Sequence, residues 1–471
     1  GGTAPIPYDR PMSDHGLRLA QDKMTAAGVT PAAIEVFSHY YRELEAGATG
    51  LILEETIEPL LEPAQLSEID VDPQLAHEAM ARTAVLKLNG GLGTSMGMDK
   101  AKSLLPVREG RTFLDLIVEQ VLHAREAYGV RLPLVLMNSF RTQADSLAAL
   151  ERYPDLAVDG LPLDFLQNQE PKLLADDLTP VSWPADPTLE WCPPGHGDLY
   201  TALLASGVLQ QLLDAGFRYA SVSNSDNLGA APEPRIAGWF AASGAPYAAE
   251  LCRRTAADRK GGHLAIRTAD GRLILRDTAQ TSPSEMDFFT DEHRHPYFHT
   301  NNLWFDLEQI AAALAARGAV LGLPLIKNTK TVDPTDPSSP AVVQIETAMG
   351  AAIEVFEGAT AIAVGRERFL PVKTTNDLLL VRSDAYELTE ARTLHLAVPS
   401  APLVDLDPAF YKTVQSFEAR FPAGTPSIRE ATTLTVRGDW TFESGVTAVG
   451  DAVLERGDDP ATVATGTTIG A

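Results

Sequence analysis

The segment Leu86–Ser103 holds the residues of this chain best suited to bind phosphate. Its first residues, Leu86-Lys87-Leu88-Asn89, have the character of a strand, and four glycines follow within the eight residues from Gly90 to Gly97. Glycines lack a Cβ atom, so their backbone N–H groups can approach phosphate oxygens closely. The spacing matches neither the phosphate loop of nucleoside triphosphatases nor the dinucleotide fingerprint, whose third glycine would fall one residue earlier. Phosphate binding and a simple tight turn are therefore both open.

A second glycine-containing turn, Pro193-Pro194-Gly195-His196-Gly197, precedes a helix that the pattern predicts over Asp198–Leu213. We expect Asp198 to be the N-cap of this helix. The start of a helix offers backbone donors to an anion, and His196 stands next to it. A capped turn without any ligand explains the same residues.

An aspartate follows the predicted strand Tyr219–Val222, in the run Ser223-Asn224-Ser225-Asp226-Asn227. The carboxyl end of a central strand is a frequent ligand site in α/β proteins, and Mg²⁺ prefers carboxylate and phosphate oxygens. The sequence therefore makes Asp226 a candidate magnesium ligand. The alternative is a solvated turn stabilised by the aspartate itself.

Two further segments carry polar residues next to apolar ones. His299–Trp304 places amides where they could read sugar hydroxyls, and Phe369–Thr375 places Lys373 after a proline-constrained apolar run. His293, His295 and His299 match no zinc spacing, so we expect surface or structural roles for them. The chain has neither a Gly-x-Ser-x-Gly elbow nor a His-Glu-x-x-His helix, so the sequence gives no basis for ester hydrolysis or metalloproteolysis.

These segments lie in a region where short apolar runs alternate with helical patterns. The alternation predicts a doubly wound, Rossmann-like, largely parallel sheet in an α/β core, whose ligands bind at the carboxyl ends of the strands. Tyr247–Arg254 and His263–Leu275, with a turn at Asp270-Gly271, predict an added antiparallel part. The expected elements of the alternating region are Val85–Leu88, Thr112–Tyr128, Leu132–Met137, Gln143–Arg152, Asp198–Leu213 and Tyr219–Val222.

The ends of the chain have a different character. The pattern from Gly16 to Leu61 is helical, and an acidic connector follows it. After Leu388 we expect a helix at Pro408–Arg420 and then short strands, Leu434–Val436, Val446–Val449 and Ala452–Leu454, separated by glycines as in a β-solenoid. The predicted domains are a helical N-terminal segment (1–84), a catalytic domain (85–388) and a C-terminal β domain (389–471).

The composition restricts the partners. The 471 residues include 63 acidic and 38 basic side chains, which leaves a net charge of −25 and disfavours binding to nucleic acid or to an anionic membrane. Any phosphate ligand must therefore be bound by a few local lysines, backbone amides and a cation. Cys192 and Cys252 are the only cysteines, and no segment is apolar and long enough to span a bilayer. We expect a cytoplasmic protein.

Taken together, the motifs resemble the eukaryotic-type UTP–glucose-1-phosphate uridylyltransferase (UDP-glucose pyrophosphorylase) family. The resemblance runs from about Val85 to Leu388 and consists of nine ordered blocks. These blocks are Lys87–Ser103, Val135–Phe140, Asn168-Gln169, Pro193–Tyr200, Val222–Gly229, Lys260–Gly262, Thr300–Trp304, Gln344–Ala352 and Phe369–Leu380. The chain departs from many members at Lys100-Ala101, where they have Gly-Pro, but it retains Lys102. The C-terminal strands resemble the left-handed β-helix domain of the family.

The resemblance implies a role for individual residues. It assigns Leu88, Asn89, Gly90 and Gly91 to the uridine and phosphates of UTP, Lys102 to the phosphates, Gln169, Gly195 and Met137 to the uracil, and Asn224 to the ribose region. It assigns His196 to the sugar phosphate, and Asn301, Glu250 and Gly262 to the glucose hydroxyls. It makes Asp226 the Mg²⁺ ligand, and it makes Lys373, which would bridge the reacting phosphates, the main catalytic lysine beside Lys102.

The implied reaction joins UTP and glucose-1-phosphate to give UDP-glucose and pyrophosphate, with Mg²⁺ as cofactor and no covalent enzyme intermediate. A broad-specificity UDP-sugar pyrophosphorylase and an N-acetylglucosamine-1-phosphate enzyme are the nearest alternatives. A catalytically silent nucleotide-binding scaffold and a nicotinamide dehydrogenase are the more distant ones. The sequence leaves the oligomeric state open, and the C-terminal β domain could mediate contacts in a homo-oligomer.

Overall fold

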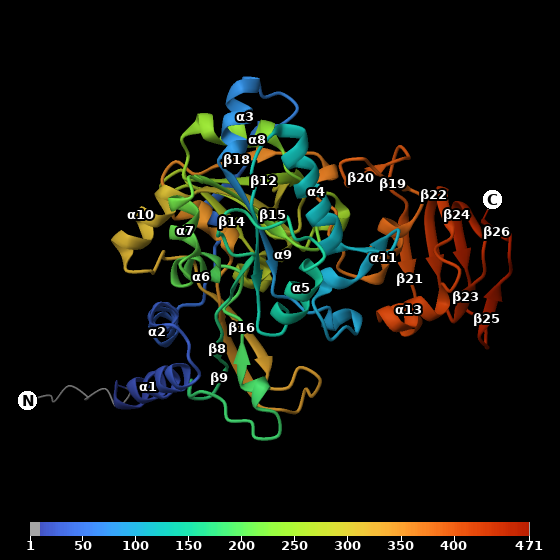
Figure 1. The fold of residues 1–471 in the computed structure, drawn as a ribbon. Helices are drawn as coiled ribbons and strands as arrows, with labels where there is room; N and C mark the ends of the chain where they lie inside the picture. Colours follow the sequence, from blue (N-terminus) through green and yellow to red (C-terminus); the bar gives the residue numbers. More distant parts are fainter. Residues whose placement is uncertain (1–9, 471) are drawn as a thin grey trace, which may run out of the picture. The chain divides into compact units, whose positions relative to one another are not determined.

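The computed structural model describes residues 10–470, which form two compact units of α/β structure (Figure 1). The first unit contains the residues up to Ala84 together with Phe165–Val222 and Arg235–Val364. The second unit contains Val85–Asp164, Ser223–Pro234 and the residues from Gly365 onward. Over residues 10–470, no helix combines the length and the apolar character that crossing a membrane requires.

The first unit is built on a mixed sheet. Its strands follow the order β2 (Ala64–Gln65), β18 (Thr360–Ala363), β12 (Tyr247–Arg253), β15 (Tyr297–Asp306) and β11 (Tyr219–Asn224). β12 is parallel to β18 and antiparallel to β15, so the sheet mixes both kinds of pairing. The predicted hairpin is confirmed as β13 (His263–Arg267) and β14 (Leu273–Arg276), closed by a 2.8 Å hydrogen bond from Gly271 N to Arg267 O.

The N-terminal part of the first unit is helical but also supplies two strands. The helices are α1 (Arg10–Ala26), α2 (Pro31–Glu45) and α3 (Pro73–Ala81). In the region expected to be helix and connector, β1 (Ile57–Pro59) pairs with β13, and β2 pairs with β18. Strands of two or three residues show no periodicity of their own, and only their partners elsewhere in the sheet define them.

The predicted helix Asp198–Leu213 is wrong in its extent. The structure has two helices, α6 (Asp198–Ala205) and α7 (Val208–Asp214), which lie beside α10 (Leu307–Arg317) in Figure 1. Gly207 adopts φ 82° between α6 and α7, and this left-handed conformation breaks the helix. The predicted N-cap is also wrong, because Gly197 occupies that position and Asp198 is the first helical residue.

The second unit contains the strand and loop that open the alternating region. β3 (Thr83–Asn89) runs parallel to β6 (Leu134–Asn138), with Leu86 opposite Val135. The helices are α4 (Phe113–Tyr128), α5 (Gln143–Leu150) and α11 (Thr375–Arg382). Thr112 and Asp115 form a capping box that fixes the start of α4, so this predicted strand–helix–strand order is confirmed.

The C-terminal part of the second unit consists of parallel strands. β21 (Leu403–Leu406), β22 (Ser427–Val436), β24 (Thr447–Leu454) and β26 (Thr468–Gly470) form one sheet, in which every neighbouring pair is parallel (Figure 1). β23 (Trp440–Phe442) and β25 (Ala461–Val463) form a second parallel pair. Two predicted strands, Val446–Val449 and Ala452–Leu454, are parts of β24, which continues through Gly450 at φ 58°. The predicted helix Pro408–Arg420 is divided into α12 (Pro408–Tyr411) and α13 (Val414–Arg420).

A buried ionic cluster joins the N-terminal segment of the first unit to its antiparallel strands. Glu54 Oε2 accepts a hydrogen bond from Arg276 Nη1 at 2.5 Å, and Glu54 Oε1 accepts one from His295 Nε2 at 2.8 Å. Arg294 Nε also donates to Glu54 Oε1, at 2.5 Å. Burial alone would raise the pKa of Glu54, but the hydrogen bonds from Arg294 and His295 outweigh it and hold this pKa below its usual value. The cluster therefore depends on an ionised Glu54.

Replacing Glu54 tests the contribution of this cluster to stability. We expect Glu54→Gln to lower the free energy of unfolding by about 1.5–3 kcal/mol, because the buried Arg276 loses one of its two carboxylate partners and keeps only Glu285. Urea denaturation measures this change. Glu55 is exposed, so Glu55→Gln serves as the matched control and should change stability by less than about 0.5 kcal/mol. A loss for Glu54→Gln no larger than that of the control would contradict the prediction.

Candidate active site

In the second unit, the glycine-rich loop after β3 closes on itself. Leu92 and Ala101 form an antiparallel bridge, and Met98 N donates to Gly93 O at 2.9 Å. A Cβ atom at Gly93 would lie 2.7 Å from the Met98 sulfur, so a larger residue there would displace the Met98 side chain. Gly91 is exposed with open space around its Cα atom, and its backbone can therefore contact a ligand. The loop combines a defined shape with an accessible backbone, as phosphate binding requires.

The loop brings Lys102 to Asp226. Lys102 Nζ lies 2.8 Å from Asp226 Oδ2, and both side chains are partly exposed. Asp226 stands in the loop after β11, and Ser225 N donates to Leu88 O at 3.0 Å, which ties this loop to β3. The sequence predicted a role for each of these two side chains separately, and the structure adds that they form an ion pair.

Lys87 holds the loop that carries Asp226, and the sequence predicted no role for it. Its side chain is buried, and Nζ donates to Ser223 Oγ at 2.7 Å and to Ala230 O at 3.0 Å. These two acceptors flank Asp226 in the chain, so Lys87 fixes the loop that carries it. The available signal was a lysine inside an otherwise apolar strand, because a buried lysine must have partners.

Two of the residues predicted to bind the nucleotide have buried side chains. The Asn89 side chain donates to Asn138 Oδ1 at 2.7 Å and to Ser146 Oγ at 2.8 Å, and it accepts from Ser103 Oγ at 2.5 Å. Asn89 therefore has only its backbone free for a ligand, while its side chain ties the end of β3 to the residue after Lys102. Met137 is also buried, within β6. Leu88, Gly90 and Asn224 are partly exposed.

Lys373 lies beside the same loop of the second unit. Pro371 forms a bridge with Asn227, and Leu370 N donates to Asn227 Oδ1 at 2.7 Å. Lys373 N donates to Asp377 Oδ2 at 2.8 Å at the start of α11, which fixes the backbone from which the side chain extends. The side chain of Lys373 is exposed. The second unit thus brings together Lys102, Asp226 and the backbone of Lys373.

In the first unit, His196 lies in a turn that only glycine allows. Gly195 has φ 79°, and a Cβ atom there would lie 2.4 Å from Thr347 O. His196 Nδ1 accepts a hydrogen bond from Met349 N at 2.9 Å, so the proton of the neutral ring stands on Nε2. Burial lowers the pKa of His196 to about 4. His196 is therefore a neutral donor, suited to an anionic phosphate oxygen.

Asn301 has an unusual backbone conformation within β15. Its φ is 64°, although it is neither a glycine nor in a turn, and the register between β12 and β15 shifts between Ala249 and Leu251. Asn301 N donates to His299 Nδ1 at 2.9 Å, which holds this conformation, and the side chain is partly exposed. Strain of this kind persists where the surrounding structure enforces it, often at binding sites.

Two other predicted sugar-binding residues have internal roles. Glu250 is buried, and its carboxylate accepts from Trp304 Nε1 at 2.9 Å and from Asn302 Nδ2 at 3.3 Å. Gly262 O accepts from His299 N at 3.1 Å. Gly262 therefore adjoins the histidine that holds Asn301, while Glu250 holds the neighbouring part of β15.

A single segment connects His196 to His299 in the first unit. Met349 donates to His196, and a Cβ atom at the next residue, Gly350, would lie 2.9 Å from His299 Cδ2. Burial lowers the pKa of His299 to about 3, so both imidazoles are neutral at physiological pH. The prediction of a structural role for His295 and His299 is confirmed, and His293 is exposed.

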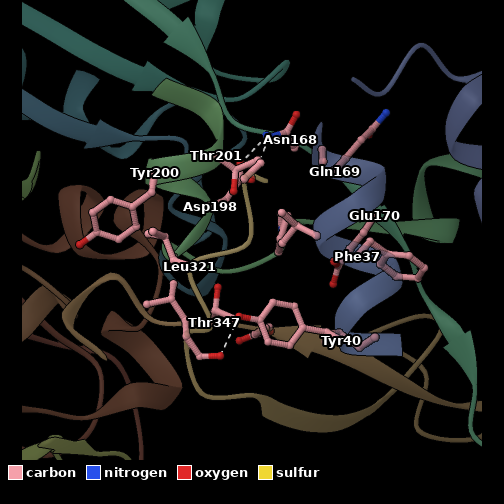
Figure 2. Close-up of a pocket in the computed structure, with 18 of the residues that line it drawn as sticks. Phe37, Tyr40, Asn168, Gln169, Glu170, Asp198, Tyr200, Thr201, Leu321 and Thr347 are labelled. Atoms are coloured by element: carbon pink, nitrogen blue, oxygen red, sulfur yellow. Dashed lines mark hydrogen bonds between the residues drawn. The ribbon is translucent and has the colours of Figure 1, made fainter. Parts of the chain in front are cut away.

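Gln169 lies at a small pocket of the first unit, shown in Figure 2. The preceding residue, Asn168, donates from its backbone N to Asp198 Oδ2 at 2.6 Å and from its side chain to Asp198 Oδ1 at 2.8 Å. Burial raises the pKa of Asp198 to about 7, and the two hydrogen bonds from Asn168 oppose this rise. Asn168 and Asp198 point toward each other in Figure 2.

Comparison with known proteins gives a consistent result. The family model described as UTP–glucose-1-phosphate uridylyltransferase matches residues 34–448. A Solanum tuberosum protein of that name is 40% identical over 406 residues, which cover 85% of this chain and 82% of that protein. A mutant of UDP-glucose pyrophosphorylase from Leishmania major, solved in complex with UDP-glucose, has a TM-score of 0.89 and 41% identity, covering 96% of this chain and 98% of that one. A Trypanosoma brucei structure called UDP-glucose phosphorylase has a TM-score of 0.88 and 40% identity, covering 97% and 98%.

The protonation state of His196 can be tested by ¹⁵N NMR of histidine-labelled protein. We expect a neutral ring with its proton on Nε2 and no titration between about pH 5 and 8. The pKa of His196 is lower in the folded chain than its usual 6.5, so its contribution to stability is complete above pH 6.5 and is lost as the pH falls toward about 4. His196→Gln assigns the resonance, and a ring that titrates near pH 6.5 in the folded protein would contradict this assignment.

Proposed function

The chain belongs to the UTP–glucose-1-phosphate uridylyltransferase family, and we propose that it makes UDP-glucose and pyrophosphate with the help of Mg²⁺ held by Asp226. An oxygen of the glucose-1-phosphate monoester attacks the α-phosphorus of UTP in line. The bond between the α-phosphorus and the oxygen that bridges to the β-phosphorus breaks, and pyrophosphate leaves. The family match over residues 34–448 carries the assignment of this reaction.

Catalysis of this transfer rests on positioning and charge neutralisation. Both substrates are anions and the chain carries a net charge of −25, so the phosphates require a local cationic site. Lys102 and the loop amides of Gly90 and Gly91 bind the phosphates of UTP. Lys373 bridges the reacting phosphates. The pairing of Pro371, two residues before Lys373, with Asn227 supports this role, because Asn227 is the residue after Asp226. Preorganised donors of this kind stabilise the charge that develops in phosphoryl transfer.

Asp226 is chemically suited to Mg²⁺. Its carboxylate is partly exposed and offers hard oxygen ligands, and Mg²⁺ commonly takes one or two carboxylates together with substrate phosphates and water. Within the described part of the chain, no group of three or more His, Cys, Asp and Glu side chains is arranged to hold a metal. Mg²⁺ held by Asp226 would neutralise phosphate charge, and Lys102 pairs with the same carboxylate.

The remaining residues divide the recognition of the two substrates. Leu88 and the backbone of Asn89 contact the nucleotide, with Met137 packed behind them. Gln169 and Gly195 contact the uracil, and Asn224 contacts the ribose region. His196 donates from Nε2 to the sugar phosphate, because its Nδ1 is occupied by Met349 N. Asn301 reads a glucose hydroxyl, and Glu250 and Gly262 keep it in place by fixing β15 and His299.

We also propose the finer organisation of the chain. Residues 85–388 form the Rossmann-like catalytic domain, 1–84 a leading segment, and 389–471 a left-handed β-helix, for which the parallel pairing of β21, β22, β24 and β26 is the support. A cytoplasmic location agrees with two buried cysteines that remain free thiols, Cys192 and Cys252.

The assay for this function measures pyrophosphate release from UTP and Mg²⁺ with glucose-1-phosphate. Galactose-1-phosphate, N-acetylglucosamine-1-phosphate, a sample without sugar and a sample with EDTA run in parallel. We expect release that depends on glucose-1-phosphate and on the metal, with an equal amount of UDP-glucose. Equal rates with several sugar phosphates would indicate a broad-specificity enzyme. Binding of UTP without release from any sugar would indicate a silent scaffold and contradict the proposal.

Replacing Lys373 tests its role in the transfer. We expect Lys373→Ala to lower kcat at least about a hundredfold, which is about 3 kcal/mol, because one charge-assisted contact to the transition state is lost. Lys412 is also exposed, so Lys412→Ala is the matched control and should keep the wild-type rate. Circular dichroism checks the fold, and a folded Lys373→Ala variant with normal turnover would remove Lys373 from the mechanism.

A further inference from the structure

We propose that Asp198 is a positioning residue for base selection, because it fixes the peptide that presents Gln169 to the nucleobase. The proposal rests on the function above, which assigns Gln169 and Gly195 to the uracil. It adds the residue that holds both of them in place.

Asp198 is tied to Asn168 by both of its carboxylate oxygens. Oδ2 accepts from the backbone N of Asn168 at 2.6 Å, and Oδ1 accepts from its side-chain Nδ2 at 2.8 Å. Asp198 is only 6% exposed, so water competes little for these hydrogen bonds. Asp198 is also the first residue of α6, where a carboxylate interacts favourably with the helix dipole. Asn168 is thus fixed in both its backbone and its side chain.

The residue after Gln169 is fixed as well. Glu170 is the first residue of β8 (Glu170–Pro171), which pairs with β10 (Trp191–Cys192), and Glu170 stands opposite Cys192. Gln169 therefore lies between two anchored residues. Its own side chain is partly exposed and has no hydrogen-bond partner among residues 10–470, so its amide is available for a ligand.

Asp198 also connects the Gln169 segment to the Gly195 turn, through its backbone. Asp198 N donates to Gly195 O at 3.2 Å, and Thr347 holds this turn through a 2.9 Å hydrogen bond from Gly197 N to Thr347 O. Asn168, Asp198 and Thr347 all line the pocket of Figure 2. Asp198 thus bonds through its side chain to the residue before Gln169, and through its backbone to the Gly195 turn.

This arrangement matters for telling uracil from cytosine. Uracil presents an N–H donor between two carbonyl acceptors, whereas cytosine presents an acceptor and an amino donor at the corresponding positions. A glutamine amide carries both a donor and an acceptor, so it can satisfy either base if it is free to move. Discrimination therefore requires a fixed backbone at Gln169. An amide that can shift forms hydrogen bonds with cytosine as readily as with uracil.

The test separates base selection from the rest of catalysis. Asp198→Asn would let the Asn168 amide turn over and keep both hydrogen bonds, so the test uses Asp198→Ala, in which both are lost. We expect KM for UTP to rise at least about tenfold and the preference for UTP over CTP, measured as the ratio of kcat/KM, to fall at least about tenfold. We expect kcat at saturating UTP and KM for glucose-1-phosphate to remain within about twofold of wild type.

A pair of exchanged variants supplies the rescue. Asn168→Asp alone places two carboxylates together and should lose selectivity, whereas N168D/D198N exchanges the amide and the carboxylate and restores the pair. We expect the double variant to recover most of the preference for UTP. The exposed Asp186, which caps a short helix nearby in the chain, provides Asp186→Ala as the control with unchanged selectivity. If Asp198→Ala does not fold, Asn168→Ala and the double variant decide the question.

The outcomes distinguish this proposal from the function on which it rests. Absence of UDP-glucose formation by the wild-type protein would refute the function itself. Unchanged base preference in Gln169→Leu would refute the assignment of Gln169 to the base. If Gln169→Leu loses base preference but folded Asp198→Ala keeps it, the positioning role is wrong. An equal loss of kcat with UTP and with CTP in Asp198→Ala, and no rescue by the exchange, would show a purely structural role.

Discussion

The ion pair between Lys102 and Asp226 is the contact on which the phosphate site of the second unit depends. A chain with a net charge of −25 repels its own anionic substrates, so the few cations near the phosphates must be precisely held. Lys102 Nζ stands 2.8 Å from Asp226 Oδ2, and each partner holds the other in an accessible position. In the proposed mechanism the two side chains have opposite roles, because Lys102 attracts phosphate and Asp226 attracts the metal ion.

Buried polar residues hold this pair in place. Lys87 fixes the loop of Asp226 through Ser223 and Ala230, and Asn89 fixes the residue after Lys102 through Ser103. In the first unit the arrangement differs. The His196 ring is neutral, and a hydrogen bond from the Met349 backbone orients it. In both units, the side chains that we propose to meet substrate, Lys102, Asp226 and His196, are partly exposed, while Lys87 and Asn89, which orient the first two, are buried and hydrogen-bonded.

The sequence predicted the local elements well where a regular pattern was present. The strands at Val85–Leu88 and Leu132–Met137 and the helix from Thr112 are confirmed within one or two residues, because hydrophobic periodicity and a capping box are local signals. The helix from Asp198 was predicted too long because the apolar pattern resumes after Gly207, whose left-handed conformation divides it into two helices. The roles of the individual residues were predicted from the resemblance to a family and not from the spacing of any single motif. No motif alone would have predicted its residues' roles.

The parts that were missed depend on contacts between residues distant in the chain. β1 and β2 have two or three residues each, and only their partners β13 and β18 make them strands. The real partner of Asp198 is Asn168, which lies 30 positions away, whereas local capping rules predicted a bond to the backbone of its own helix. Lys87 was visible as a charge in an apolar strand, but its acceptors lie more than a hundred positions further along the chain.

A double-mutant cycle on Lys102 and Asp226 tests the central claim most directly. The measured quantity is the rate of UDP-glucose formation by wild type, Lys102→Met, Asp226→Asn and the double variant, with Lys100→Met as a control on the same exposed loop. If the two side chains act as a unit, each single substitution lowers kcat at least about a hundredfold, and the double variant is no slower than the slower single one. Effects that multiply to about ten-thousandfold in the double variant, or a single variant with near-normal turnover, would contradict the account.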